Sequence, residues 1–586
     1  MVAQEGRSSP TAGAVAAPLH VAVDAAVEVE ALATPKQIDD NDVYVDIGDE
    51  GDAKPMMRTA SYRSLHRHSS RQLLSRLESS IHPEHSKALL PTTVLYVTIL
   101  IALIGSFQTG WLLTQLNYLP FSNAKHCAAT PIAPHTCILF PGHSKREWTM
   151  AVTGWVLGAA VGAVGSGLPA DKFGRKRTMF FNAFVMIVGG IVQAMAQDIY
   201  LFAVGRFISG VATGTVINVS NVLISEVSPC QMRGLFTAGI QVGVALGSLT
   251  VTSTHYFIGT GNVLWRFMVG FPIVFGTIQI LLMPFMCQSP VWLVAQNKVT
   301  EAGAAMRRLY QPTDFESILD ALVHSHEEEA AELAKVNLWG SFFSRKYLRQ
   351  VAIAVVLCTS QQFNGINAVM YYSATIFYSA GVTDPRVANT IINVVRTLAV
   401  FGSAKTIDKF NRRTIIIAGM TTMGLASTGL VIALINGIPA LAIASVSIFV
   451  AAWGLSIGPC AWMVSAEIFP DFLRANAGSV GTMFTWLSNF TVAVVYPTLA
   501  SEDNLGNYAF TIFIGFCVAY ILFVVFCLPE TGGKTYVEIA RSFGIEEAEH
   551  HLPEDHDPWA KSRVSSPFSD VATSFHEEVA VGDKQK

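Results

Sequence analysis

Amide and phenol side chains crowd into one short stretch, residues 361–372, with the sequence QQFNGINAVMYY. The stretch follows the apolar run VAIAVVLCTS, whose composition suits the interior of a lipid bilayer. A buried amide without a hydrogen-bond partner costs about 1–3 kcal/mol, so several amides at this depth require one another, water or a ligand. Because an amide both donates and accepts through a neutral head, it pairs well with hydroxyl groups. The chemistry indicated is reversible binding of a polyhydroxylated solute.

The rotation of a helix separates these amides. At 100° per residue, Gln361 and Asn364 share a face, whereas Gln362 lies about 100° round from Gln361. Asn367 lies about 240° round. One straight helix cannot aim all of them at one cavity, so we expect a break near Gly365 that lets the amides line a central cavity. The alternative is that they bond neighbouring helices to one another.

The elements that must position this stretch are membrane-spanning helices. The chain has 586 residues, of which 51% are hydrophobic and 14% charged, and its mean hydropathy of +0.41 lies outside the range of ordinary soluble domains. About 20 apolar residues cross a hydrocarbon core as a helix. We predict an all-α membrane protein with about twelve spans, at approximate positions 93–116, 148–168, 178–197, 200–223, 235–257, 265–286, 348–379, 386–404, 413–435, 438–465, 474–500 and 507–528.

Two charged motifs occur twice, in the same order. GLPADKFGRKR is echoed by DKFNRRT at an offset of 237 residues, from position 171 to 408, and EVSPCQMR by EIFPDFLR at an offset of 241 residues, from 226 to 467. The nearly equal offsets indicate two homologous halves. The charged residues concerned are Asp171, Arg175, Glu226 and Arg233 in the first half, and Asp408, Arg412, Glu467 and Arg474 in the second.

These acids and bases lie near predicted helix ends, where they can form ion pairs across the seam between the halves, and Glu226 can pair with Arg175 or its neighbours. Such pairs would latch the cytoplasmic side closed. On that interpretation, their removal favours inward opening. The alternative is that the positive charges only orient the chain.

Lys and Arg gather in the loops that follow every second span, so by the positive-inside rule both termini are cytoplasmic. Both tails are polar and are expected to be mostly disordered. Cys127 and Cys137 share the first external loop and form either a disulfide or two free thiols. We divide the chain into an N-terminal tail (1–90), a six-helix bundle (91–286), a cytoplasmic linker with short helices (287–347), a second six-helix bundle (348–528) and a C-terminal tail (529–586).

The ordered series of motifs resembles the sugar-porter branch of the major facilitator superfamily, in particular the facilitative hexose transporters. The series covers about residues 93–540 and consists of GSFQTG, GLPADKFGRK, GRF, EVSP, QQFNGINAVMYY, GPCAW, EIFP and PETGGKT. The resemblance implies two pseudo-symmetric six-helix bundles with short intracellular helices, and transport by alternating access. It implies sugar contacts at Gln241, Gln361, Gln362, Asn367, Trp462 and Asn489, with Trp486 as an aromatic wall.

The chain departs from this pattern at four places. Arg396 stands where the family usually has Asn, and Gly454 where it usually has Glu. The loop motif usually read as PESPR is MCQSPVW, with Gln288 and Val291 in place of the acid and the base. Leu112 occupies the place where proton-coupled symporters carry Asp. Since leucine cannot titrate, we expect a uniporter.

Arg396 is the sharpest departure, because a cation in mid-span costs about 2.5–3.5 kcal/mol on insertion scales. It lies about 14 Å from either end of its span, too far for full snorkelling. Two interpretations stay open: a guanidinium bonded to carbonyls or water in the bundle interior, or a substrate contact. The second makes an anionic or acid sugar a credible cargo.

The function we expect is passive transport of a monosaccharide, foremost a hexose, across the plasma membrane. The alternatives are a nontransporting sugar sensor that signals through its tails, and a proton-coupled or other carrier of a polar solute such as a polyol or a sugar acid. The sequence has no nucleophile–base pair, P-loop or metal-ligand spacing, so no enzyme, metal or cofactor is expected. A net charge of −4 without a basic domain argues against nucleic acid. The partners expected are the sugar and the lipid bilayer, and the oligomeric state is left open.

Overall fold

A computed structural model describes most of the chain between residues 90 and 545. The described ranges are 90–122, 127, 137–258, 263–311, 318–320, 322–324, 326–327, 337–470, 473–534 and 536–545, all within one compact unit. The tail predicted over residues 1–90 lies outside these ranges except for its last residue, as does everything beyond residue 545.

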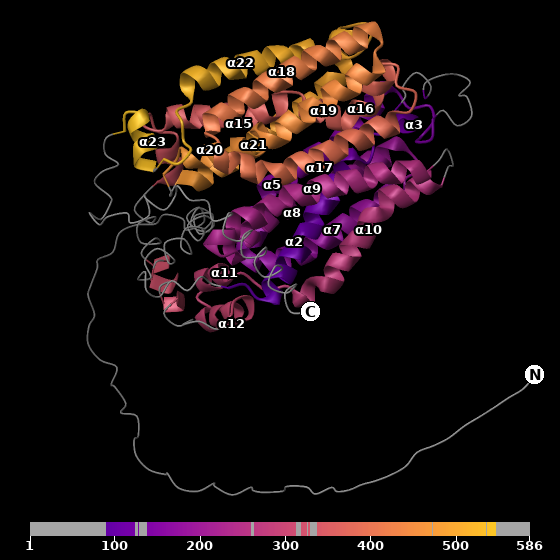
Figure 1. The fold of residues 1–586 in the computed structure, drawn as a ribbon. Coiled ribbons are helices and arrows are strands. Elements are labelled where there is room, and N and C mark those ends of the chain that lie inside the picture. The colour runs from indigo at the N-terminus through magenta and orange to yellow at the C-terminus, as the bar shows by residue number, and fades with distance from the viewer. Residues whose placement is uncertain are drawn as a thin grey trace, which may run out of the picture. The chain divides into compact units, whose positions relative to one another are not determined.

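Six long helices of the first part of the chain pack together, and we call them the first group (Figure 1). They are α2 (Thr93–Thr114), α5 (Lys145–Gly165), α7 (Arg175–Met195), α8 (Ile199–Val227), α9 (Cys230–Ile258) and α10 (Leu264–Leu282). Helix α8 lies against α5, α7 and α2, while α10 covers α7. The α5–α8 contact is backbone to backbone, since a Cβ atom at Gly210 would lie 2.2 Å from the Trp155 carbonyl oxygen.

The second group consists of α15 (Leu348–Phe363), α16 (Ile366–Ser379), α17 (Pro385–Lys409), α18 (Arg412–Asn436), α19 (Pro439–Leu455), α20 (Ile457–Glu467), α21 (Arg474–Leu499) and α22 (Thr511–Cys527). Helix α18 lies against α19 and α22, and α15 lies against α20 and α21. The two groups meet mainly along two helix pairs, α9 with α17 and α5 with α21 (Figure 1), and α16 also contacts α2.

Nine of the described helices are long and apolar enough to cross a membrane. The predicted spans that do not qualify are 348–379, 386–404 and 474–500, although each is helical in the structure. The first is split into two short helices, and the other two carry several Asn, Ser and Thr residues along their length. The all-α fold is therefore confirmed for the described part of the chain, and the three predicted spans outside the nine carry most of the predicted sugar contacts.

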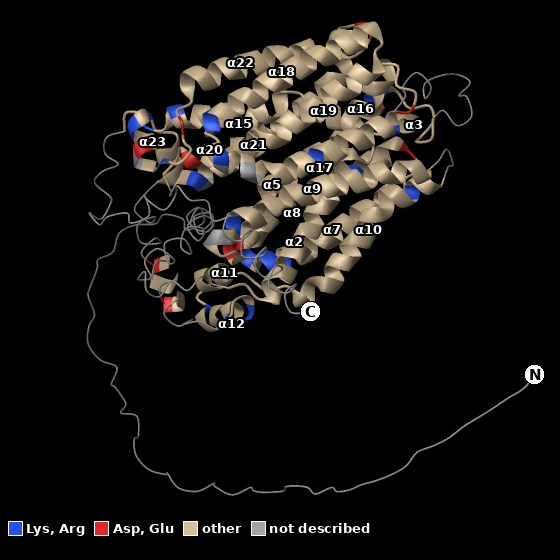
Figure 2. Ribbon diagram, viewed as in Figure 1, with Lys and Arg blue, Asp and Glu red and all other residues tan. Residues whose placement is uncertain are grey.

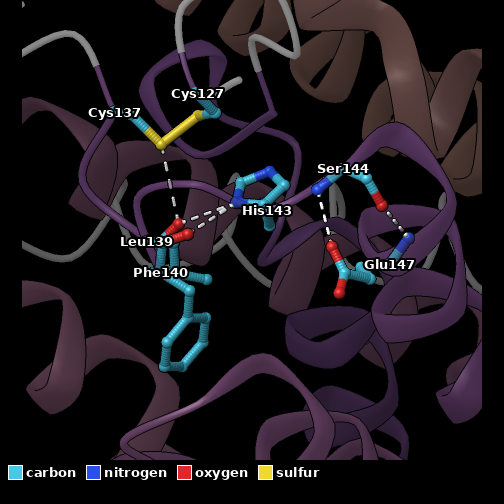
Figure 3. Close-up of a disulfide and its surroundings, with 7 residues drawn as sticks. All are labelled: Cys127, Cys137, Leu139, Phe140, His143, Ser144 and Glu147. Atoms are coloured by element: carbon cyan, nitrogen blue, oxygen red, sulfur yellow. Dashed lines mark hydrogen bonds between the residues drawn. A yellow bond between two sulfur atoms is a disulfide. The ribbon is translucent and has the colours of Figure 1, made fainter. Parts of the chain in front are cut away.

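The loop between α2 and α5 holds a disulfide between Cys127 and Cys137, whose Cα atoms are 5.1 Å apart (Figure 3). The Nδ1 atom of His143 lies 3.1 Å and 3.0 Å from the carbonyl oxygens of Leu139 and Phe140. Ser144 then starts α5 with a capping box, in which its side chain and that of Glu147 each accept the other's backbone N–H. We call this end of the helices the disulfide end.

The opposite end, which we call the basic end, gathers most of the charged residues (Figure 2). Its short helices are α6 (Gly167–Phe173), α11 (Pro290–Ala295), α12 (Val299–Leu309), α14 (Leu338–Phe342) and α23 (Tyr536–Ser542). Helix α12 contacts α2 of the first group, whereas α14 contacts α21 of the second.

The first part of the C-terminal segment, from residue 529 to residue 545, docks on the second group. Glu530 accepts the backbone N–H groups of Arg412 and Arg413 at 2.9 Å and 3.1 Å, and so caps the start of α18. Ile539 and Ala540 of α23 are buried. The polar composition of the segment gives no sign of this docking. The segment is held by the bonds of Glu530 to the N-terminus of α18 and by a few apolar residues.

The predicted break at Gly365 is present, between α15 and α16. Gly365 adopts a left-handed conformation with φ of +97°, and its N–H bonds the carbonyl of Gln362 instead of continuing the helical ladder. The side chain of Asn364 accepts the N–H of Ile366 at 3.0 Å, which caps the first turn of α16. A Cβ atom at Gly365 would lie 2.7 Å from the ring of Phe513.

Gly365→Ala should therefore lower the thermal unfolding midpoint of the purified protein in detergent. The left-handed backbone costs about 1–2 kcal/mol for any residue with a Cβ atom, and the clash with Phe513 adds about 1–3 kcal/mol. The matched control is Gly515→Ala in α22, where a Cβ atom would meet nothing within 4 Å. The control should leave the midpoint unchanged or raise it, and equal midpoints for the two variants would contradict the analysis.

Candidate functional site

The two helix breaks of the second group, at Gly365 and at Ser456, are bonded to each other. The side-chain amide of Gln361 donates to the carbonyl of Gly458, in the first turn of α20. In return, the indole N–H of Trp453, near the end of α19, donates to the carbonyl of Gln361 at 3.2 Å. That carbonyl has lost its helical partner at the break, so the bond from Trp453 replaces a ladder hydrogen bond.

The remaining amides of the stretch pair locally. Gln362 accepts a hydrogen bond from the side chain of Asn367 across the break, and both residues are buried. The break thus brings together Gln362 and Asn367, which a straight helix would have aimed in different directions. The alternative reading, that the amides bond neighbouring helices, holds for Gln361, which bonds α20, whereas Gln362 and Asn367 bond each other. That these amides line a central cavity stays a prediction.

Aromatic rings join the two groups beside these amides. Tyr371 of α16 donates to the side chain of Asn489 in α21 at 3.1 Å. Its ring lies edge-on to Trp155 of the first group, with centroids 6.4 Å apart. Trp155 also meets Trp486, with centroids 6.2 Å apart. Asn489 and Trp486, both predicted sugar contacts, thus lie at the contact between α5 and α21.

Gln241 and Trp462 stand apart from this hydrogen-bonded set. Gln241 is exposed on α9, seven residues before Ser248 and so within about 20° of the same helix face. Trp462 is partly exposed on α20, one turn after Gly458. Neither side chain takes part in the hydrogen bonds found among the described residues.

Arg396 is buried in the contact between α17 and α9, with 4% of its surface exposed. Its Nη1 atom donates to the Ser248 hydroxyl of the first group at 3.2 Å, and lies 3.8 Å from the sulfur of Met370. Its Nε atom is buried without a hydrogen-bond partner in the structure. The guanidinium therefore lies in the interior, and its described neighbours are a hydroxyl and a thioether instead of carbonyls.

Sequence reasoning missed a network around Asn117, in the loop that follows α2. The Asn117 side chain donates to the carbonyl of Met370 at 2.9 Å and to Ser373 at 2.6 Å, and accepts the N–H of Ala374 at 2.9 Å. Its carbonyl accepts from the Asn389 side chain at 3.2 Å. The sequence feature that could have indicated this network is the spacing of Asn389, Asn393 and Arg396. It places three polar side chains on one face of α17.

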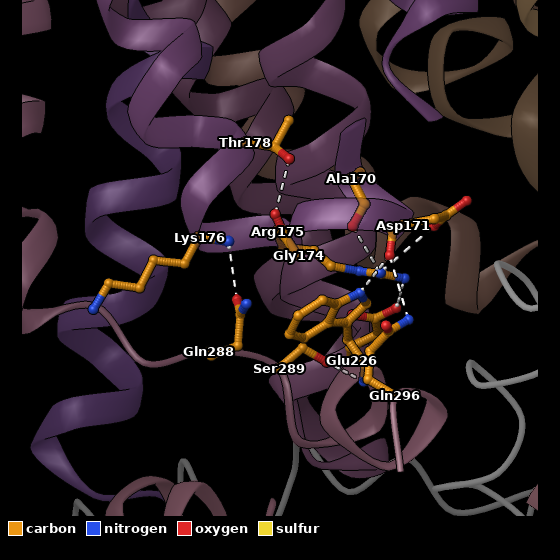
Figure 4. Close-up of polar contacts among 11 residues, drawn as sticks. Ala170, Asp171, Gly174, Arg175, Lys176, Thr178, Glu226, Gln288, Ser289 and Gln296 are labelled. Atoms are coloured by element: carbon orange, nitrogen blue, oxygen red, sulfur yellow. Dashed lines mark hydrogen bonds and ion pairs between the residues drawn. The ribbon is translucent and has the colours of Figure 1, made fainter. Parts of the chain in front are cut away.

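At the basic end, Arg175 is the centre of a buried polar cluster (Figure 4). It contacts Glu226 at 2.7 Å and Asp171 at 3.5 Å, and donates to the carbonyl of Ala170 at 3.1 Å. Gln288, which replaces the usual acid, accepts the backbone N–H of Lys176 at 3.0 Å. It lies so close to Gly174 that a Cβ atom there would be 2.1 Å from its amide nitrogen.

The second half repeats the arrangement with weaker contacts. Arg412 lies 3.7 Å from Glu467, and Arg474 donates to the carbonyl of Ala466 at 3.1 Å. Arg233 is partly exposed near the start of α9, and the side chain of Asp408 lies outside the described residues.

Glu226 pairs with Arg175 as predicted, and Arg412 lies near Glu467; each of these two ion pairs joins neighbouring helix ends of one group. A latch across the seam between the groups stays a prediction. The hydrogen bonds described between the two groups lie instead in the half of the helices nearer the disulfide end.

No resident metal is indicated in the described part of the chain. The residues that come close to a ligand set are Cys127, Cys137 and His143. The two sulfurs are bonded to each other in the disulfide, so neither is a thiolate that could bind a metal.

Known proteins resemble the chain over most of its length. A family model described as "Sugar (and other) transporter" matches residues 97–543. Solute carrier family 2, facilitated glucose transporter member 3 of Homo sapiens is 30% identical over 471 residues, which cover 77% of this chain and 92% of the relative. Member 14 of Homo sapiens is 30% identical over 486 residues, which cover 80% and 91%.

Solved structures show the same fold. The proton:xylose symporter XylE bound to 6-bromo-6-deoxy-D-glucose superposes with a TM-score of 0.63 at 22% identity, over 77% of this chain and 99% of that one. The inward open conformation of XylE from E. coli gives a TM-score of 0.63 at 22% identity, over 76% and 99%. The family match and the relatives at 30% identity show that the chain belongs to the sugar transporter family of the major facilitator superfamily, as a multi-pass integral membrane protein and not an enzyme.

Proposed function

We propose that this protein is a facilitative transporter that moves a hexose-sized monosaccharide by alternating access, without a coupling ion. The observation that carries the proposal is the amide-rich break at Gly365, placed beside the contact between the two helix groups. Its amides pair with each other and with a carbonyl. A sugar hydroxyl can replace one amide of such a neutral pair as the hydrogen-bond partner of the other, at little net cost in free energy.

The proposed binding set is Gln241, Gln361, Gln362, Asn367, Trp462, Trp486 and Asn489. Gln241 is exposed, and Trp462 and Trp486 are partly exposed, so three members of the set are not sealed inside the protein. The relatives named as facilitated glucose transporters support a sugar as the cargo.

The pattern of contacts between the groups supports alternating access. Asn117, Asn393 and Tyr256 tie the groups together toward the disulfide end. At the basic end, the charged residues stabilise each group separately. This arrangement fits a carrier that is closed at the disulfide end. Rocking of the two groups would break the contacts at that end and form others at the basic end.

Uniport is supported by the absence of an acid at mid-depth. Asp and Glu occur in the described spanning helices only in the first or last turn. Leu112 is fully buried, and its carbonyl accepts a hydrogen bond from Arg206 at 3.0 Å. No side chain at that place can carry a proton.

We place both termini and the basic end in the cytoplasm, and the protein in the plasma membrane. The excess of Lys and Arg at the basic end supports this orientation, and the disulfide supports an oxidising space at the other end. In this proposal residues 91–286 and 348–528 are the two moving bundles, with 287–347 as the linker.

Gln361→Ala should reduce saturable uptake of labelled sugar into proteoliposomes by tenfold or more, because it removes an amide from the proposed site and frees the helix break. The matched control is Gln279→Ala, which also removes a buried amide but one that bonds the Ile101 carbonyl inside the first group. The control should keep uptake within about twofold. Absence of uptake by the unmodified protein would favour the sensor alternative.

Asn117→Ala should favour opening at the disulfide end, because it removes three side-chain hydrogen bonds between the groups. The measurement is the rate at which a membrane-impermeant maleimide modifies a cysteine placed at Thr252, a buried position of α9. We expect a rise of several fold over the same cysteine with Asn117 intact. Asn218→Ala, whose bonds stay inside the first group, is the control. Equal rates for both variants would contradict the proposed gate.

A further inference from the structure

Arg396 is a buried cation for which the described structure offers no carboxylate. Its two contacts are to a neutral hydroxyl and a thioether, and its Nε atom has no partner. No acid lies outside the end turns of any described spanning helix. A buried charge without a counterion is costly, and such residues in membrane spans mark substrate or ion pathways.

Arg206 provides the contrast, because it is also a cation within a span and is almost completely buried. Its guanidinium lies over the ring of Trp155 at 5.6 Å and donates to the Leu112 carbonyl, in the last turn of α2. A carbonyl at a helix C-terminus carries partial negative charge, so Arg206 has a structural partner. Arg396 has no described hydrogen-bond partner with such a partial negative charge.

Near Arg396 the described structure has an unpartnered hydrogen-bond acceptor but no acidic side chain. Asn393, one turn away on α17, donates to Thr252 and to the Asn389 carbonyl, but its side-chain oxygen is buried without a partner. A Cβ atom at Gly454 would lie 3.1 Å from that of Ala399, so a side chain at this position of α19 would start against α17 one turn from Arg396. With glycine there, no acid from α19 neutralises the guanidinium.

We propose that the transported monosaccharide is a monoanion, a sugar carboxylate, whose carboxylate pairs with Arg396. The inference rests on the proposed transport function and names its substrate class. A carboxylate would accept from the free Nε–H and the neighbouring Nη of the guanidinium, while a sugar hydroxyl would donate to the free oxygen of Asn393. One unpaired cation matches one negative charge, which favours a carboxylate over a doubly charged phosphate ester.

The test compares uptake of D-glucuronate with uptake of D-glucose by the full-length protein in proteoliposomes. We expect saturable glucuronate uptake that Arg396→Asn lowers by tenfold or more and Arg396→Lys lowers less, with the ratio of glucuronate uptake to glucose uptake falling in Arg396→Asn. The matched control is Lys409→Asn, which removes an exposed charge from the same helix about 20 Å away. It should leave both rates unchanged.

A second measurement needs no variant, so it holds even if the Arg396 variants do not fold. An inside-positive potential of about 60 mV should accumulate glucuronate about tenfold, because each transport cycle carries one negative charge, and it should not accumulate glucose. Accumulation that does not follow the potential overturns the inference.

The other outcomes are distinguishable. Saturable uptake of glucose without glucuronate overturns the inference and leaves the proposed function standing. Uptake of neither sugar defeats both. Equal losses for both sugars in Arg396→Asn would make Arg396 a structural residue and also overturn the inference.

Discussion

Polar groups inside a bilayer must find partners within the protein, and this constraint shapes the centre of the molecule. A break in a spanning helix frees backbone groups, and here two broken helices supply each other. Gln361 donates to the Gly458 carbonyl beside the break that separates α19 and α20, and Trp453 donates to the Gln361 carbonyl beside the break at Gly365. This exchange holds the irregular, amide-rich segment between α15 and α16 through hydrogen bonds within the protein.

The two helix groups are joined by a small set of hydrogen bonds. The described hydrogen bonds between them come from neutral Asn, Thr and Tyr side chains and from one cation, Arg396. Hydrogen bonds of this kind contribute about 1 kcal/mol each, so a few of them can close one side of a carrier without locking it. The stronger contact, between Arg175 and Glu226, lies inside the first group and keeps that group rigid. Rigid groups with a weak seam are what a rocking motion requires.

Much of the fold was predictable because apolar length and the spacing of repeated motifs report directly on spanning helices. The break at Gly365 was predictable as well, since helix rotation aims Gln362 and Asn367 apart and glycine permits the left-handed turn. The pairing of Glu226 with Arg175 was predictable too, because the two charged motifs lie at predicted helix ends on the same side of the membrane. Whether such pairs also form across the seam depends on where the helix ends of the two groups meet, which the sequence does not report. The Asn117 network was missed for the same reason, because its partners lie more than 250 residues away.

The central claim is that the two groups rock about the amide-rich break, so that the two ends of the protein open in turn. Spin labels in a background without free cysteines test it directly. One pair reports on the disulfide end, at Lys145 and Asp503, and one on the basic end, at Lys172 and Lys409, all exposed positions. On addition of a transported sugar, the account predicts that the distance distribution at one end moves to longer values while that at the other end moves to shorter values. Distances that stay fixed, or that lengthen at both ends together, would contradict it.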